Sequence, residues 1–299
     1  MALDTTNKID LNRSTTGVAL PKDVLDEVWQ GIRENSAVMQ LSRNMAIPGT
    51  GVTVNIITGD PEPGWVTEST EKPVDTPTIS NKAMQPYKLA VIVPFSNEFR
   101  RDLPTLYSAV VERVPFALAK KFDSTVFFGT APGTNFDTLS SVTAVDLEAD
   151  PAGAINGAMT DIAVAGGAAT GIVMSPQGYG ILSGAKGSGG DLIFAGSYNT
   201  AVGAITPFGL TTLQRHAAYK AGSSAANSIG FIGDWTKAIV GTVQDITVDF
   251  SDQATINDGT RQVNLWQRNM FALRCEMEVG FIVEDAKYFQ KFTDTYPKA

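Results

Sequence analysis

A glycine-rich run is the first feature of this chain whose residue types suggest chemistry. Residues 184–190 read Gly-Ala-Lys-Gly-Ser-Gly-Gly, and the backbone amides of such loops can cradle a phosphate. A P-loop requires Lys and then Ser or Thr after its final glycine, whereas this run continues into Asp191. Gly178 and Gly180 begin a dinucleotide-binding pattern, but Ser183 occupies its third glycine position. A surface loop is the better interpretation, and no cofactor is expected.

The single histidine and the single cysteine, His216 and Cys275, are the next candidates for catalysis. His216 follows Arg215, and the chain has no Gly-x-Ser-x-Gly nucleophile motif. Cys275 falls on the apolar face of an alternating segment, which predicts a buried core thiol rather than a nucleophile. One histidine and one cysteine are also too few ligands for a structural zinc site. We therefore expect no metal and no internal disulfide.

The remaining candidates are acidic residues and one tryptophan. Glu284 and Asp285 point to opposite sides of the chain if the strand before them continues, so they do not form an acid/base pair. Trp65 and Glu68 have the residue types of a sugar site, but packing within a hairpin explains them equally well. No ordinary active site emerges, and the chain is not expected to be a turnover enzyme.

Composition narrows the class of protein further. The chain has 299 residues, a formal net charge of −8 and no cluster of Lys and Arg, so tight binding to nucleic acid is not expected. A weakly acidic surface would instead repel DNA. The first 13 residues are polar, without a signal peptide's apolar core, and the apolar run at residues 89–93 is too short to cross a bilayer. These features predict a soluble protein made in the cytoplasm, with no membrane partner.

The N-terminal third is predicted to contain long segments without a core of their own. Residues 1–20 are polar and read as a loose arm, and an amphipathic helix is expected from Pro21 to Asn35. Strands are expected at Val52–Ile57 and Tyr87–Phe95. The proline-rich excursion between these strands is too long for an ordinary loop, so we interpret it as an arm-like hairpin that reaches onto another molecule.

A long helix and an α/β lobe should follow. Ser96 or Asp102 is a plausible N-cap, Pro104 fits the first turn, and apolar residues recur at helical spacing until about Gly129. Pro115 interrupts this pattern and should kink the helix, or else the helix is misplaced. Residues 132–235 are rich in Ala, Gly and Ser. They are predicted to form a separate α/β lobe with the following elements: helix Pro151–Val164, strand Gly171–Met174 and helix Gln177–Ala185.

The strongest local pattern lies near the C-terminus. Every odd position from Phe271 to Val283 is apolar or Cys275, and the intervening positions include an arginine and several glutamates. Unbroken alternation of this length predicts a long, half-buried strand. Val243–Phe250 shows a shorter version of the same pattern. A long helix with long antiparallel strands is an α+β framework.

The order of these parts resembles the Hong Kong ninety-seven type of tailed-phage capsid protein. Residues 64–68, Gly-Trp-Val-Thr-Glu, are similar to the Trp-x-x-Glu stretch of that family's extended loop. Residues 88–96 look like the return strand of that loop, and residues 232–235, Ile-Gly-Asp-Trp, look like the turn that leaves the axial domain. Residues 264–281 are similar to the family's closing strands. Each motif is weak, but their order is specific and covers nearly the whole chain.

The resemblance implies a domain organisation for the α+β fold. It implies an N-terminal arm, an N-terminal helix region, an extended hairpin loop, a peripheral domain with a spine helix, and an inserted axial domain. The expected boundaries are, in that order, 1–20, 21–50, 51–95, 96–131 together with 236–299, and 132–235.

The function that the resemblance implies is structural. Pentamers and hexamers of this chain would form an icosahedral head around double-stranded DNA, within a virion assembled in the bacterial cytoplasm. The implied partners are other copies of the chain, a portal protein and packaged DNA held by non-specific contact, and a decoration protein is possible in such a head. No long scaffolding segment precedes the arm, so a separate scaffolding protein, or none, is implied. Two alternatives stay open: an encapsulin-type compartment shell, and a soluble α+β enzyme that uses the glycine-rich lobe.

The resemblance also implies one reaction, because some members of that family join their subunits by a self-catalysed isopeptide bond. Lys72, followed by proline, resembles the attacking lysine of the extended loop. Asn269 resembles the acceptor, and Glu276 resembles the assisting carboxylate seven residues later. A lysine attacks only as a neutral amine, so a carboxylate must take its proton. Lys82 is a second lysine in the same loop, and an alternative interpretation is that all of these residues serve only packing and solvation.

Overall fold

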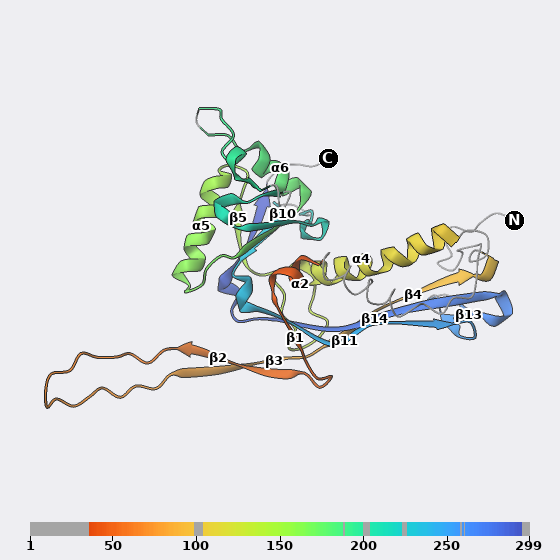
Figure 1. Ribbon diagram of the computed structural model, residues 1–299, viewed down its shortest axis with the longest axis horizontal. Helices are drawn as coiled ribbons and strands as arrows, with labels where there is room; N and C mark the ends of the chain where they lie inside the picture. Colours follow the sequence, from red (N-terminus) through yellow and green to blue (C-terminus); the bar gives the residue numbers. More distant parts are fainter. Residues whose placement is uncertain are drawn as a thin grey trace.

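A computed structural model describes most of the chain (Figure 1). The residues described are 36–98, 104–187, 189–199, 204–222, 226–257, 259 and 261–294. The predicted arm at 1–20 and the predicted helix at 21–35 lie outside them. The described residues form a long sheet with one long helix on it, a projecting two-stranded hairpin, and a second lobe built on its own sheet.

The long sheet has the strand order β1-β11-β14-β4. Strands β11 (Ala238–Ser251) and β14 (Met270–Val283) are antiparallel, as are β14 and β4 (Tyr87–Ser96), whereas the short β1 (Arg43–Ala46) is parallel to β11. The predicted strands at 87–95 and 271–283 are confirmed. The strand predicted at 243–250 is longer than expected, because pairing with β14 continues back to Ala238.

Helix α4 (Pro104–Phe128) lies along one face of this sheet (Figure 1). Its residues Val114, Leu118, Phe122 and Val126 are all buried, so one helical stripe faces the sheet. The same cluster contains every odd residue of β14, from Phe271 to Val283. The helix predicted from Pro104 is confirmed. It continues through the buried Pro115, so the proline does not mean that the helix was misplaced.

Alternation predicted that the opposite face of β14 would be exposed, but much of this face is buried. Its middle carries the exposed Arg274, as expected, but both ends are covered. Ala272 packs in a cluster with Val263 of β13 (Gln262–Asn264) and with Leu265, which follows that strand, and Ile282 packs with Ile47 and Met84. Alternation within a strand predicts which face is buried against the core. It does not predict that segments distant in the sequence also cover the ends of the opposite face.

The projecting hairpin consists of β2 (Val52–Gly59) and β3 (Thr78–Met84), joined by an exposed loop over residues 60–77. It extends well beyond the rest of the molecule (Figure 1). Its root is Met84, which is fully buried over Gly241 and Gly280, two glycines directly opposite each other in β11 and β14. A Cβ on Gly280 would lie 2.9 Å from the Met84 side chain, so glycine leaves the space that holds the hairpin root.

The second lobe is built on the strand order β5-β15-β10-β6-β9. The strands are β5 (Thr143–Asp146), β15 (Phe289–Asp294), β10 (Asn227–Gly233), β6 (Gly171–Met174) and β9 (Thr211–Gln214), with α5 (Pro151–Val164) and α6 (Pro176–Gly184) packed around them. The elements predicted at 151–164, 171–174 and 177–185 are confirmed. The C-terminal strand β15 pairs with β10 and β5 in this lobe, although residues 236–299 were all expected in the peripheral domain.

The remaining elements are short. They are α2 (Ala37–Leu41), β7 (Tyr198–Asn199), β8 (Ala204–Ile205), β12 (Thr255–Asn257), β13 (Gln262–Asn264), and the 3-10 turns η1 (Ala195–Ser197), η2 (Pro207–Gly209), η3 (His216–Ala218), η4 (Trp235–Lys237), η5 (Trp266–Arg268) and η6 (Ala286–Tyr288).

Aromatic packing joins the two lobes. Phe127 of α4 stacks on Phe231 of β10 with ring centroids 4.7 Å apart, and Trp235 meets Phe289 edge-on at 5.3 Å.

A buried carboxylate fixes α2 against α4. Asp123 of α4 accepts hydrogen bonds from the Ser36 hydroxyl at 2.6 Å and from the Ala37 backbone N–H at 2.8 Å. Ser36 in turn caps α2 by accepting from the Met39 N–H. Burial raises the pKa of Asp123 to about 6, because desolvation outweighs the hydrogen bonds that favour the carboxylate.

This shift predicts how the stability of the fold changes with pH. A carboxyl group with a raised folded-state pKa binds its proton more tightly in the folded state, so its contribution to stability increases as pH falls from about 7 toward 4. The free energy of unfolding of the wild type, minus that of Asp123→Asn, should increase by about 2 kcal/mol between about pH 7 and pH 4.5. Denaturant unfolding of both proteins at each pH measures this difference. The contributions of the other acidic residues are common to both proteins and cancel in the difference. A difference that does not change with pH would contradict it.

Candidate functional site

The nucleotide-site candidates of the sequence are loop and helix residues in the structure. Gly178 and Gly180 lie within α6, and Lys186 of the glycine-rich run pairs with Leu192 through an isolated antiparallel bridge. Gly190 has a φ of 86°, the left-handed conformation that glycine permits. His216 begins η3. Among the described residues, no group of His, Cys, Asp and Glu is arranged to hold a metal ion. No helix of the described chain is long and apolar enough to cross a membrane.

Cys275 is the buried core thiol that the alternating pattern predicts. Its side chain is 3% exposed and belongs to the cluster between β14 and α4. Burial raises the pKa of the thiol to about 11, so the reactive thiolate is scarce near neutral pH.

The two adjacent acids near the C-terminus stabilise local structure. Glu284 forms an ion pair with Lys237 at 2.8 Å, and Asp285 accepts a hydrogen bond from the Lys287 N–H at the start of η6. The hydrogen bond to Glu284 raises the pKa of Lys237, and backbone hydrogen bonding from Lys287 lowers the pKa of Asp285.

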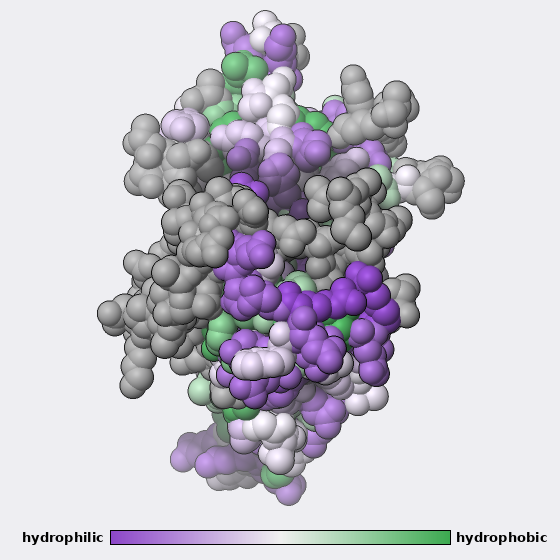
Figure 2. All heavy atoms as spheres, turned by 90° about the vertical axis from the view of Figure 1, so that its right-hand side faces the viewer, coloured by the Kyte–Doolittle hydropathy of each residue, from purple (hydrophilic) through white to green (hydrophobic). Residues whose placement is uncertain are grey.

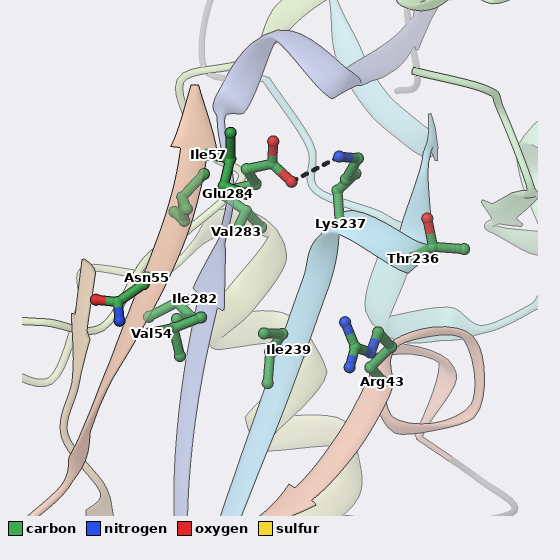
Figure 3. Close-up of a pocket in the computed structure, with 11 residues that line it drawn as sticks. Arg43, Val54, Asn55, Ile57, Thr236, Lys237, Ile239, Ile282, Val283 and Glu284 are labelled. Atoms are coloured by element: carbon green, nitrogen blue, oxygen red, sulfur yellow. Dashed lines mark ion pairs between the residues drawn. The ribbon is translucent and has the colours of Figure 1, made fainter. Parts of the chain in front are cut away.

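A pocket of about 350 Å³ lies between the hairpin root and the sheet (Figure 3). Val54 and Ile57 of the hairpin form one side, and Ile239 and Ile282 of the sheet form another. The Lys237–Glu284 pair and Arg43 stand at its rim. None of the candidate catalytic residues from the sequence lines it except Glu284, whose carboxylate is already paired. The pocket therefore does not support the enzyme interpretation.

The hairpin loop carries the predicted donor, Lys72. Residues 60–75 contain five acids, Asp60, Glu62, Glu68, Glu71 and Asp75, and Lys72 is their only cation. Lys72 is exposed and forms no ion pair with the residues that the structure describes. Trp65 on the same loop is fully exposed at 106% of its reference area, so packing within the hairpin does not explain this residue.

Lys82, the second lysine of the hairpin, has a different environment. Its ammonium lies 2.6 Å from the Asp137 carboxylate and donates to the Val283 carbonyl at 2.8 Å. Its side chain is only one third exposed. Lys82 therefore ties the hairpin root to the end of β14, and Lys72 is the lysine whose amine is accessible.

Asn269, the predicted acceptor, ends η5 in the left-handed conformation with φ 54° and ψ 45°. Asn97 holds it twice: the Asn97 backbone N–H donates to the Asn269 carbonyl at 2.9 Å, and the Asn97 side-chain amide donates to Asn269 Oδ1 at 2.9 Å. A hollow of about 140 Å³ opens beside it, lined by Asn97, Asp252, Leu265, Trp266, Asn269 and Met270. Of the six residues that line this hollow, the sequence analysis predicted a functional role only for Asn269. Asn97 and Asp252 carry no motif and lie next to it only through folding.

Glu276, the predicted assisting carboxylate, lies on the polar face of β14. Its side chain is 19% exposed, with the Arg274 guanidinium at 3.3 Å and the Lys88 ammonium at 3.8 Å. Seven residues of extended strand separate it from Asn269, a span of about 23 Å.

The structure does not bring Lys72, Asn269 and Glu276 together within one chain. The hairpin loop lies at one end of the molecule, and the turn between β13 and β14 that contains Asn269 lies at the other (Figure 1). The end that carries β13 presents a mixed, mainly hydrophilic surface with scattered apolar residues (Figure 2). A bond between Lys72 and Asn269 therefore requires at least two molecules.

Comparison with known proteins identifies what this chain resembles. The model of the phage capsid family matches residues 16–294. A probable major capsid protein of Mycobacterium phage L5 is 30% identical over 283 residues, which cover 87% of this chain and 84% of that protein. The corresponding protein of Mycobacterium phage D29 is 29% identical over similar shares. A solved chain from Mycobacterium phage Adephagia superposes with a TM-score of 0.72 at 23% identity, covering 89% of this chain and 92% of that one.

The interpretation of Cys275 as a buried core thiol, and not as a nucleophile, can be tested by its rate of chemical modification. At about pH 8, Cys275 should react with a thiol reagent on the order of 10²-fold more slowly in the folded protein than in urea, because both its thiolate fraction and its access are reduced. Reagent absorbance against time measures the rate, with free cysteine as the control. Rapid reaction of the folded protein would mean that Cys275 is accessible and that a nucleophilic role must be reconsidered.

Proposed function

This chain belongs to the phage capsid family and is a major capsid protein of the virion, and we propose that its pentamers and hexamers close an icosahedral shell around double-stranded DNA. The family match over nearly the whole chain carries this conclusion. The fold agrees with it, since the spine helix α4, the long strands and the projecting hairpin occur in the order that the sequence resemblance implies.

The hairpin supports self-assembly on physical grounds. Residues 60–77 are exposed throughout, including Trp65 and Val74, so the loop buries nothing within its own chain. Apolar side chains stabilise a structure only where they are buried away from water. A second copy of this chain would bury Trp65 and Val74. Arg268, beside Asn269 at the opposite end of the chain, offers a positive charge to a loop with five acids and one lysine. The hairpin of one copy would therefore lie on the body of its neighbour.

Further partners follow from the same proposal. A closed head that fills with DNA needs a portal protein at one vertex, a separate scaffolding protein would set its size, and a decoration protein would bind outside. The net charge of −8 favours only non-specific contact with DNA, and assembly would take place in the bacterial cytoplasm. An encapsulin-type compartment is the remaining alternative on this fold, and its particles would contain cargo protein instead of a genome.

A second part of the proposal is covalent: Lys72 of one subunit forms an isopeptide bond with Asn269 of another. The accessible amine of Lys72, the hollow beside the Asn269 amide and their positions at opposite ends of the molecule support it. The lysine nitrogen attacks the amide carbon, and ammonia leaves. Glu276 would accept the proton, and it reaches the reacting atoms only from a neighbouring subunit.

The assembly proposal predicts the effect of shortening the hairpin. Replacing residues 60–77 with a short Gly-Ser turn should leave the subunit folded, because the replaced loop is exposed, but should prevent closed shells. Sedimentation of the expressed protein in a sucrose gradient distinguishes fast shells from slow subunits. Circular dichroism of the slow fraction is the control for folding. Normal shells from the shortened chain would contradict the role given to the hairpin.

The cross-link proposal predicts opposite results for two matched lysine variants. Lys72→Arg and Lys82→Arg both keep the positive charge, but arginine does not act as the attacking amine. Lys72→Arg should abolish the ladder of linked subunits on a denaturing gel of boiled shells, and Lys82→Arg should leave it unchanged. Glu276→Gln should also abolish the ladder while shells still form. If boiled wild-type shells gave a single monomer band, no cross-link would form, and Lys72, Asn269 and Glu276 would serve only packing.

A further inference from the structure

The exposed face of α4 carries cations that are dispersed in the sequence. Arg113 and Lys120 are two turns apart, so both point to the same side of the helix, and Lys121 lies beside Lys120. All three side chains are exposed, and within the described part of the chain none of them forms an ion pair. Among residues 112–128, Glu112 is the exposed acid, because Asp123 is buried. This face of the helix is therefore positive, although the whole chain is acidic.

A fourth cation continues these charges at the C-terminal end of α4. The Lys220 ammonium donates to the Phe128 carbonyl at 3.4 Å and lies 5.8 Å from the centre of the Phe128 ring. From Arg113 to Phe128 the helix rises about 22 Å. We call Arg113, Lys120, Lys121 and Lys220 the cation row.

The other side of the subunit lacks a comparable row. Odd residues of β14 face α4, so Gly280, over which Met84 packs, lies on the opposite face of the sheet. The hairpin root therefore sits on the side away from α4. The cations in the middle of that side, Lys88 and Arg274, form ion pairs with carboxylates of the sheet at 3.2 and 2.6 Å. Positive charge without a partner is thus concentrated on the α4 side.

We propose that the cation row is a contact surface for the phosphate backbone of double-stranded DNA, and that α4 faces the interior of the shell. This inference rests on the proposed shell and names the part of its wall that touches the packaged DNA. The hairpin, which reaches onto neighbouring subunits, leaves from the other side of the sheet. The α4 side therefore stays open toward the contents.

The row has the properties of a sequence-independent phosphate contact. A phosphate must displace the carboxylate from a paired cation, whereas Arg113, Lys120 and Lys121 have no such partner to lose. Arg113 and Lys121 are separated by about 12 Å along the helix axis, and the major groove of DNA has a width of about 12 Å. The two side chains can therefore reach phosphates on both sides of a groove. Few contacts per subunit and the acidic remainder of the chain keep the binding loose.

A second copy of the acidic hairpin loop is the competing occupant of this face. Neighbouring subunits of a closed shell turn the same side outward, so a hairpin that leaves from the side opposite α4 meets its neighbour on that side. Phe116, on the α4 face, is 49% exposed. A single exposed apolar side chain is common on protein surfaces and does not make a docking patch. The observations therefore favour DNA.

The salt dependence of DNA binding tests the row in soluble full-length subunits. Fluorescence anisotropy of a short labelled duplex gives the affinity, and circular dichroism confirms that each variant is folded. Four phosphate contacts predict a log–log slope of about −3.6, a loss of affinity on the order of 10²-fold between about 50 and 200 mM salt. Lys120→Gln combined with Lys121→Gln should reduce the slope to about −1.8.

The matched control removes the same two charges elsewhere. Arg43→Gln combined with Lys186→Gln changes exposed residues outside α4 and should keep the wild-type slope. Equal slopes for the two double variants would overturn the contact surface, and shells that still sediment normally would show that the proposed shell is unaffected.

A cysteine at Ala117, on the exposed face of α4, tests its orientation in closed shells. In Ala117→Cys shells, N-ethylmaleimide should enter and react, whereas a maleimide on a large polyethylene glycol should react only with free subunits. The native Cys275 is buried and serves as the slow background. Reaction of closed shells with the large reagent would place α4 outside. Reaction with neither reagent would mean that another copy, such as its hairpin loop, covers this face. Either result would overturn the proposal.

Discussion

The burial of one face of β14 beneath α4 is the interaction on which the rest of the subunit depends. Every odd residue from Phe271 to Val283 enters the same core as the buried stripe of the helix. A continuous apolar face of this length buries enough surface to order a long strand and a long helix together. The other parts attach to the ends of this unit. Met84 roots the hairpin over Gly280, and β15, which follows β14 after the turn η6, enters the second lobe.

The hairpin loop and the turn around Asn269 lack comparable burial. Trp65 and Trp266 are both largely exposed, although tryptophan is usually buried on average. A subunit that is complete by itself would gain stability by covering them, whereas a shell subunit can leave them for its neighbours, so that interface area replaces core area. The exposed segments lie at opposite ends of the molecule. This arrangement suits a repeated contact in which one end of each copy meets the other end of the next.

Which parts of the fold could be predicted from the sequence depends on how far apart the interacting residues are along the chain. The alternation of β14 and the helical spacing after Pro104 are local, and both elements occur where the patterns place them. The pairing of β15 with β10 was not predictable, because its register joins Asn227 to Asp294 and no local pattern encodes that partner. Coverage of the second face of β14 was missed for the same reason.

The candidate site follows the same rule. Lys72, Asn269 and Glu276 were found through a family resemblance, and the structure then separated Lys72 from Lys82 by the Asp137 ion pair of the latter. Asn97 and Asp252 have ordinary residue types in unremarkable surroundings along the chain. They lie beside Asn269 only because the end of β4, the end of β11 and η5 meet at one corner.

The positions of Lys72 and Asn269 at opposite ends of the molecule would have a kinetic consequence for the proposed bond. A single subunit cannot bring Lys72 to its own Asn269, and free subunits at ordinary concentrations meet too rarely and too briefly for a slow amide exchange. In the closed shell that we propose, each hairpin would be held against its neighbour, and the effective concentration of the Lys72 amine near Asn269 would rise toward about the millimolar range or above. Formation of the proposed bond would then depend on assembly having placed the right surfaces together. Because Lys72 and Asn269 cannot react within one subunit, the proposed bond would form only between correctly assembled subunits.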